Sequence, residues 1–240
     1  MNLLYLDLLG TKKKWEQGGR RAVEAAFATF EALVQSGLAH VSPAELLQGG
    51  IEADSAAIVC ADGVQALRLS QAILTKAFNE DAEDATTRLW IRGAIVPVGN
   101  PGPLRATEPM DPPFANIAVH RYSAPLLEAI SVERSGFKGM RILIADALVN
   151  DPLREAMRIP VGPRHLIPLR RLDHSRYRVE GFQDWLWMLP RDENEWTRAK
   201  RQMAARLRWA AADADEFLQA AATQVVFHES EAIWGSLRTP

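Results

Sequence analysis

The sequence contains a single cysteine, Cys60, and no long apolar run. One cysteine cannot form an internal disulfide or a metal-binding spacing, and its apolar neighbours predict a small buried side chain. No apolar segment approaches the roughly 18–20 residues that a membrane-spanning helix needs. The first residues also lack the basic region and apolar stretch of an export signal. We therefore expect a cytoplasmic, or at least reducing, location.

The sequence also lacks an excess of charge of either sign. Lysine and arginine together number 28 against 30 acidic residues, for a formal net charge of -2. This balance gives no electrostatic reason to expect a nucleic acid or an anionic membrane as partner. The 240 residues are 48% hydrophobic and 24% charged, which is typical of a globular protein. The length suits one large domain, or one domain with an appendage.

The N-terminal segment combines an apolar strand with one carboxylate. Residues 3–9 are apolar except for Asp7, and Gly10 follows them. Burying an unpaired carboxylate is costly, so such a residue is usually paired or coordinates a cation. A helical pattern over about residues 18–38 comes next, and backbone N–H groups at such a helix entrance can hold phosphate. Two interpretations stay open: Asp7 caps the turn, or it is a metal ligand beside a phosphate site.

A second aspartate, Asp54, lies where the sequence predicts a hairpin. Asp54-Ser55 is expected to form a tight turn between two strands, because both side chains bond readily to their own backbone. If the first strand lies beside this hairpin in one antiparallel sheet, Asp7 and Asp54 meet at one edge. Their oxygens would suit Mg²⁺ or Mn²⁺. The alternative is that Asp54 only forms the turn.

The remaining sequence alternates helix and strand patterns. We expect a helix over about residues 63–80, a strand pair over 88–98, a proline-rich loop over 99–113, a helix from about Phe114 that Pro125 kinks or splits, a strand over 140–145, and a hairpin from 164–172 and 179–189. Gly93 is expected where backbone or ligand approaches closely. From Asp192 onward, helix formers predict an amphipathic helix or helix pair that packs against the body or a partner subunit.

This order of motifs resembles the catalytic domain of class III nucleotidyl cyclases over about residues 1–190. The segment Asp7-Leu8-Leu9-Gly10 is similar to that family's first metal motif, and Asp54 to its second metal aspartate. Residues 92–95 resemble its glycine-containing fourth strand. Residues 116–121 resemble the helix that carries a transition-state asparagine and arginine, and residues 141–144 resemble the strand after it.

The resemblance implies an α+β, ferredoxin-like (βαββαβ) fold with a mainly antiparallel sheet over residues 1–190. The helix formers after it predict a helical C-terminal extension over residues 191–240. The resemblance also implies a homodimer with active sites at the interface. The residue roles that it implies are these: Asp7, Asp54 and the Leu8 backbone carbonyl hold two Mn²⁺ or Mg²⁺ ions; Asn116 and Arg121 are catalytic; and Leu9, Gly10, Thr11, Lys12, Gly50 and Asp111 bind substrate.

Two departures from the family pattern point to the substrate. Purine cyclases usually have Phe-Thr after the motif's glycine and a base-reading Lys or Glu four residues before the second aspartate; this chain has Thr11-Lys12 and Gly50. It most resembles the pyrimidine cyclases of the Pycsar antiphage defence system. That resemblance implies cyclisation of UTP, or less readily CTP, to a 3′,5′-cyclic monophosphate with release of pyrophosphate. Arg121 lies one position beyond the family spacing from Asn116, so the register of this pair stays open.

Three other interpretations compete with this one. The chain could be an adenylate or guanylate cyclase with an unusual base pocket, or an inactive cyclase-homology module that dimerises or binds nucleotide. The segment Gly49-Gly50-Ile51-Glu52 superficially resembles the GGDEF signature of diguanylate cyclases. Its acidic residue is shifted, however, and the aromatic residue is missing, which argues against that assignment.

Overall fold

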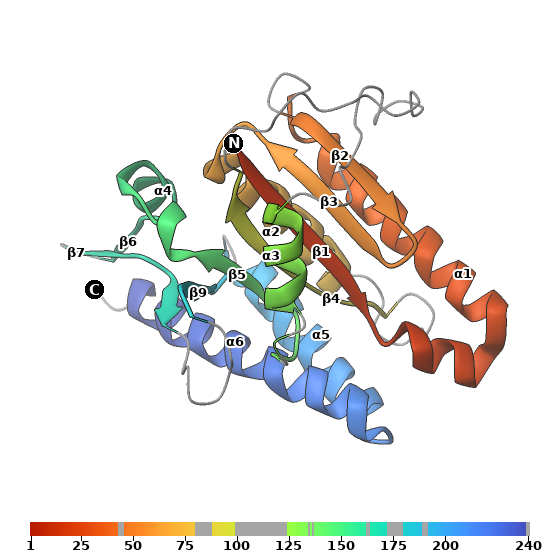
Figure 1. The fold of residues 1–240 in the computed structure, drawn as a ribbon. Helices are drawn as coiled ribbons and strands as arrows, with labels where there is room; N and C mark the ends of the chain where they lie inside the picture. Colours follow the sequence, from red (N-terminus) through yellow and green to blue (C-terminus); the bar gives the residue numbers. More distant parts are fainter. Residues whose placement is uncertain are drawn as a thin grey trace.

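The computed structural model describes residues 1–42, 46–79, 88–98, 124–133, 135, 137–161, 164–171, 180–188 and 192–238 (Figure 1). The strands in this part of the chain are β1 (Asn2–Leu9), β2 (Leu46–Glu52), β3 (Ser55–Cys60), β4 (Trp90–Pro97), β5 (Ile142–Ala145), β6 (Ile159–Val161), β7 (Arg164–Leu166), β8 (Leu169–Arg171) and β9 (Phe182–Trp185). The helices are α1 (Thr11–Leu38), α2 (Gly63–Asn79), α3 (Ala124–Glu133), the short 3-10 helix η1 (Asp146–Leu148), α4 (Asp151–Ala156), α5 (Glu193–Ala210) and α6 (Ala214–Arg238).

The described strands form a seven-stranded sheet in the order β2-β3-β1-β4-β5-β9-β8, and β6 and β7 form a separate pair. Neighbouring strands in the large sheet are antiparallel except for β4 and β5, which are parallel. The predicted α+β class is confirmed. Strand β1 lies in the interior of the sheet between β3 and β4, as its almost continuous apolar sequence requires.

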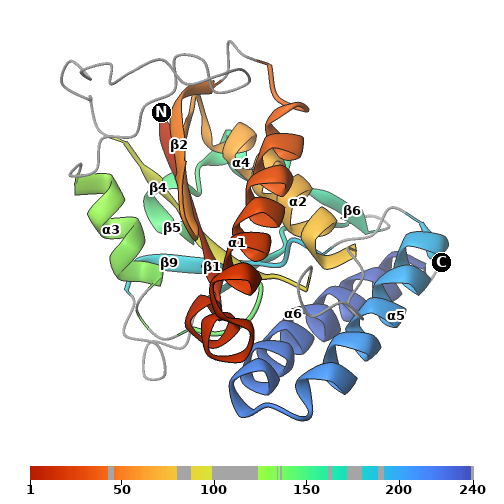
Figure 2. The same ribbon diagram turned by 90° about the vertical axis from the view of Figure 1, so that its right-hand side faces the viewer.

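Helices cover both faces of the sheet. Figure 2 shows α3 on one side and α1 and α2 on the other. Helix α3 packs on β1 and β4, and α2 packs on β1, β3 and β4. Pro125 lies in the first turn of α3, where its missing N–H costs no helical hydrogen bond.

Helix α1 begins earlier than the sequence pattern predicts. Gly10 adopts a left-handed conformation (φ 82°) that ends β1, and the helix starts directly at Thr11. It then bends at Gly19, whose φ of 60° and ψ of -157° are not helical. The run Lys12–Lys14 therefore lies on the first turn of a helix and not in a loop.

Two further boundaries differ from expectation, and one expectation is met. Residues 90–97 form one strand instead of a strand pair, and the hairpin turn is Ala53-Asp54, with β3 beginning at Ser55. Gly93 lies where two backbones approach closely, as expected. A Cβ atom at this position would lie 2.0 Å from the Tyr5 carbonyl oxygen.

The C-terminal helices pack on each other and on the body. Trp196 of α5 stacks on Phe227 of α6 with ring centroids 4.6 Å apart, and α5 also contacts α2. None of the described helices combines the length and the apolarity needed to cross a membrane.

Arg206 of α5 is wholly buried and joins the helices to the body. Its guanidinium donates to the carbonyl oxygens of Ala77 (2.7 Å), Phe78 (3.3 Å) and Leu89 (3.0 Å). Burial lowers its pKa to about 9, so the side chain keeps its charge at neutral pH. The end of α2 and the approach to β4 are thus held by one residue of α5.

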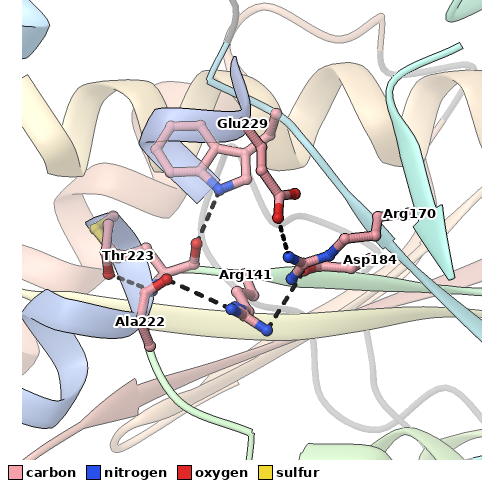
Figure 3. Close-up of polar contacts among 8 residues, drawn as sticks. Arg141, Arg170, Asp184, Ala222, Thr223 and Glu229 are labelled. Carbon is pink, nitrogen blue, oxygen red and sulfur yellow. Dashed lines mark hydrogen bonds and ion pairs between the residues drawn. The ribbon is translucent and has the colours of Figure 1, made fainter. Parts of the chain in front are cut away.

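A network of charged residues joins α6 to strands β8 and β9, at one edge of the sheet (Figure 3). Asp184 of β9 lies 2.7 Å from an arginine nitrogen of Arg170 in β8 and 3.4 Å from one of Arg141, which precedes β5. Arg170 also pairs with Glu229 of α6, and Arg141 donates to the Ala222 carbonyl at 3.5 Å. These contacts make α6 part of the body's structure.

Candidate functional site

The structure brings Asp7 and Asp54 to the same end of the sheet. Asp7, near the end of β1, lies opposite Ser55, which directly follows Asp54 in the hairpin turn. The Leu8 N–H donates to the Asp54 carbonyl oxygen at 2.7 Å. Both aspartates are half-buried, so both remain accessible to solvent.

A side-chain contact also ties Asp54 to the start of α1. The Thr11 hydroxyl donates to Asp54 Oδ2 at 3.2 Å. Because Gly10 turns the chain sharply between β1 and α1, Thr11 faces the hairpin turn instead of continuing the strand. The strand end, the hairpin turn and the helix start therefore form one connected unit.

Arg92 is a polar neighbour of Asp7 that sequence reasoning did not single out. It lies opposite Asp7 on β4, so both side chains leave the same face of the sheet. Burial lowers the pKa of Arg92, while Asp7 and Tyr5 act in the opposite direction. Arg92 Nη1 also donates to the Phe137 carbonyl at 2.6 Å. The available signal was an arginine inside an apolar strand, the same anomaly as Asp7 in β1.

A cavity of about 350 Å³ lies between the first turns of α1, the start of β4 and α6, and it is lined by Arg92 but by neither Asp7 nor Asp54. Its described lining comprises Leu9, Gly10, Lys12, Lys13, Lys14, Glu16, Gln17, Trp90, Arg92, Lys138, Asp215, Glu216 and Gln219. Leu9, Gly10 and Lys12, which were predicted to bind substrate, are among them. Cationic side chains outnumber acidic ones, so the cavity favours an anion.

The lysines of α1 differ in environment. The Lys12 side chain is 91% exposed, whereas that of Lys13 is 28% exposed and forms an ion pair with Asp213, just before α6. Lys13 is therefore more buried in the cavity lining than Lys12, the lysine that was predicted to bind substrate. Sequence alone could not distinguish them, because the contact comes from the other end of the chain.

The carboxylate pair suits one type of metal site better than others. The described residues contain no group of three or more His, Cys, Asp or Glu side chains that could hold a metal ion. A closed structural zinc site normally needs four such ligands. Mg²⁺ and similar hard ions are often held by one or two carboxylates, with water and substrate phosphates completing the shell. Asp7, Asp54 and a backbone carbonyl fit that pattern.

The other predicted site residues are only partly described. Gly50 of β2 lies opposite Ala57 of β3, and Ala57 lies opposite Tyr5 of β1. Gly50 is therefore on the same face of the sheet as Asp7, level with the residue two positions before it. Asp111, Asn116 and Arg121 lie outside the described residues. Their assignment as base-reading and catalytic residues stays a prediction.

Comparison with known proteins gives no independent assignment. No family model and no curated protein sequence matches the chain.

Proposed function

We propose that this protein is a metal-dependent nucleotide cyclase that converts UTP, or less readily CTP, to the 3′,5′-cyclic monophosphate and pyrophosphate, as a second messenger in antiviral defence. The observation that carries the proposal is the position of Asp7 and Asp54 at the same end of the sheet, where the Leu8 N–H donates to the Asp54 carbonyl oxygen. Thr11, at the helix start, donates to Asp54, and Arg92, which lies opposite Asp7, lines a nearby cavity that neither aspartate lines.

The chain topology supports the same proposal. The first six elements of the sheet run β1-α1-β2-β3-α2-β4, and their strands have the order β2-β3-β1-β4 with antiparallel neighbours. This strand order supports the proposal of a ferredoxin-like (βαββαβ) unit. It is the arrangement that the resemblance to class III cyclases implies, with the first metal motif on β1 and the second between β2 and β3.

Asp7, Asp54 and the Leu8 carbonyl would hold Mn²⁺ or Mg²⁺, which supplies positive charge where the phosphate oxygens gain negative charge. The chain's own contribution is to bind and orient the nucleotide. In the reaction the ribose O3′ forms a bond to the α-phosphorus, the bond from that phosphorus to the β-phosphate oxygen breaks, and the hydroxyl proton passes to solvent. Positioning and charge stabilisation supply most of the rate.

Other residues have narrower roles in this proposal. The lysines at the start of α1 bind phosphate oxygens, and Gly50 leaves room in the base pocket where purine cyclases have a base-reading side chain. Arg121 and Asn116 stabilise the transition state, with the active site completed at a homodimer interface. Arg92 keeps a positive charge beside Asp7, which limits the negative charge of the carboxylate pair before ions and substrate bind.

The test is product analysis with each of the four nucleoside triphosphates and Mn²⁺, with separation by mass. We expect cyclic UMP as the main product. Asp7→Asn and Asp54→Asn should each abolish it, whereas the control Asp62→Asn, at a capping aspartate that accepts from the Gln65 N–H at 2.9 Å, should not. No cyclic product from any nucleotide contradicts the enzyme assignment, and cyclic AMP or GMP alone contradicts the pyrimidine assignment.

One observation favours a second candidate, an inactive cyclase-homology module. Arg92 already brings a fixed positive charge to Asp7, which weakens the attraction of that carboxylate for a cation. Titration with Mn²⁺ distinguishes the two: binding that requires both Asp7 and Asp54 supports the enzyme, and its absence in a chain that still dimerises supports the module.

A further inference from the structure

The cavity beside the strand-end site is closed on one side by α6 and the residue that precedes it. Asp213 forms an ion pair with Lys13 of α1, and the two side chains are 15% and 28% exposed. Asp213 Oδ1 also accepts from the N–H groups of Asp215 and Glu216 at 3.0 Å, so it caps α6. One residue thus fixes both the beginning of α6 and a cation of the cavity.

Helix α6 also fixes the segment that carries Lys138, another cation of the lining. The Gly139 N–H donates to Gln219 Oε1 at 2.7 Å, and the Met140 N–H donates to Thr223 Oγ1 at 2.9 Å. Gly139 has a φ of 85°, and a Cβ there would lie 2.7 Å from the Thr223 backbone nitrogen. The segment therefore packs directly on α6, and the position of Lys138 depends on that helix.

The charges of the cavity indicate its ligand. Among the described lining residues, the cations Lys12, Lys13, Lys14, Arg92 and Lys138 outnumber the acids Glu16, Asp215 and Glu216. Glu16 pairs with Lys12 of the same lining, and Glu216 pairs with Arg88 outside it, while Lys13 pairs with Asp213. The volume of about 350 Å³ is within the range of small-molecule sites. Lysines from separate elements can bind successive phosphates of one chain as point charges.

We propose that α6 completes a polyphosphate-binding pocket in which Lys13, Lys14, Arg92 and Lys138 bind the anion and the Asp213 carboxylate competes with that anion for Lys13. The identification of the ligand as the triphosphate of a nucleotide rests on the proposed function. The affinity for a polyphosphate rests on the cavity alone. The C-terminal helices are then part of the binding site and not only a support for the fold.

The test is calorimetric titration of the full chain with inorganic tripolyphosphate in a metal-free, EDTA-containing buffer. We expect Lys13→Gln and Lys138→Gln each to weaken binding about tenfold, since each removes one charge-assisted hydrogen bond. The matched control is Lys76→Gln on α2, whose Nζ donates to the Ser36 hydroxyl at 2.8 Å outside the cavity, and it should bind as the wild type does. Absence of binding by the wild type, or equal binding by Lys138→Gln and Lys76→Gln, would overturn the proposal.

Asp213→Asn tests the role of α6 without removing its cap, because asparagine caps helices as well as aspartate does. It should bind tripolyphosphate about threefold more tightly, as expected for the loss of one partly exposed ion pair that competes with the ligand. The double variant Lys13→Gln/Asp213→Asn should bind as Lys13→Gln does. An unchanged affinity of Asp213→Asn would overturn the competition. The titration contains neither metal nor nucleotide, so the pocket can fail while cyclisation is found, and the reverse.

Discussion

Two aspartates in interior strands of one sheet, Asp184 and Asp7, have opposite environments. Asp184 of β9 is 0% exposed and lies between Arg141 and Arg170. Asp7 of β1 is half-buried, and it lies at the end of its strand beside a second half-buried carboxylate, Asp54. A buried carboxylate whose neighbours are arginines holds structure together. We propose that the pair of accessible carboxylates at the end of β1 binds a ligand.

The electrostatics of the two sites lead to the same distinction. Burial raises the pKa of Asp184, and the charges of Arg141 and Arg170 act against that rise. The carboxylate therefore depends on its two arginines, and removing Asp184 takes away a buried charge that both of them share. At Asp7 the cation Arg92 is engaged with the Phe137 carbonyl as well, and solvent reaches the carboxylate.

The largest effect on stability is expected at the buried site. Asp184→Ala should lower the free energy of unfolding by about 3–5 kcal/mol, because it removes the buried carboxylate that pairs with Arg141 and Arg170. Urea unfolding followed by circular dichroism measures the change. The control is Asp151→Ala at the exposed first residue of α4. A loss below about 1 kcal/mol would mean that the network does not stabilise the fold.

Arg206 is the second buried charge, and its loss is expected to be somewhat less costly. Arg206→Met keeps much of the volume but leaves the carbonyl groups of Ala77, Phe78 and Leu89 without this donor. The expected loss is about 2–4 kcal/mol. Arg208→Met, at an exposed position on the same helix, is the matched control and should change stability little. Equal unfolding midpoints for the two variants would contradict this role of Arg206.

The sequence predicted the parts of the fold that local patterns encode. The apolar run around Asp7 indicated β1, and the turn residues near Asp54 indicated a hairpin within one residue of its actual turn. It missed the start of α1, because three lysines and Gly18-Gly19 resemble a loop although lysine is a good helix former.

Contacts between distant segments could not be predicted in the same way. Nothing local distinguishes Lys13 from Lys12, because the difference is the ion pair of Lys13 with Asp213. Nor does a charged, arginine-rich stretch of α5 indicate that Arg206 is buried, since arginine is mostly exposed in proteins. Of the apolar residues of the last two helices, Trp196 and Met203 are buried whereas Phe217 and Val225 are exposed, and their packing against a partner subunit stays a prediction.

Gly93 tests how closely the strand carrying Arg92 must approach β1. Gly93→Ala places a methyl group 2.0 Å from the Tyr5 carbonyl oxygen, so the two strands must separate. We expect a loss of about 1–3 kcal/mol, as for other overpacked sites, measured by urea unfolding. Separation of β1 and β4 should also lower turnover, because the next pair along these strands is Asp7 and Arg92. A variant as stable as the wild type would show that β4 is free to move.

The smallest effect on stability, and the largest on function, is expected at Asp7. Asp7→Asn removes a charge from a half-buried position and keeps the shape of the side chain, so the free energy of unfolding should change by less than about 1 kcal/mol. Mn²⁺-dependent cyclisation should nevertheless be lost, because the remaining carboxylate of Asp54 cannot hold the ion in place alone. Unfolding and product formation are measured on the same preparation. If Asp7→Asn destabilises the fold as much as Asp184→Ala and leaves turnover intact, Asp7 is a structural partner of Arg92 and the distinction between the two aspartates is wrong.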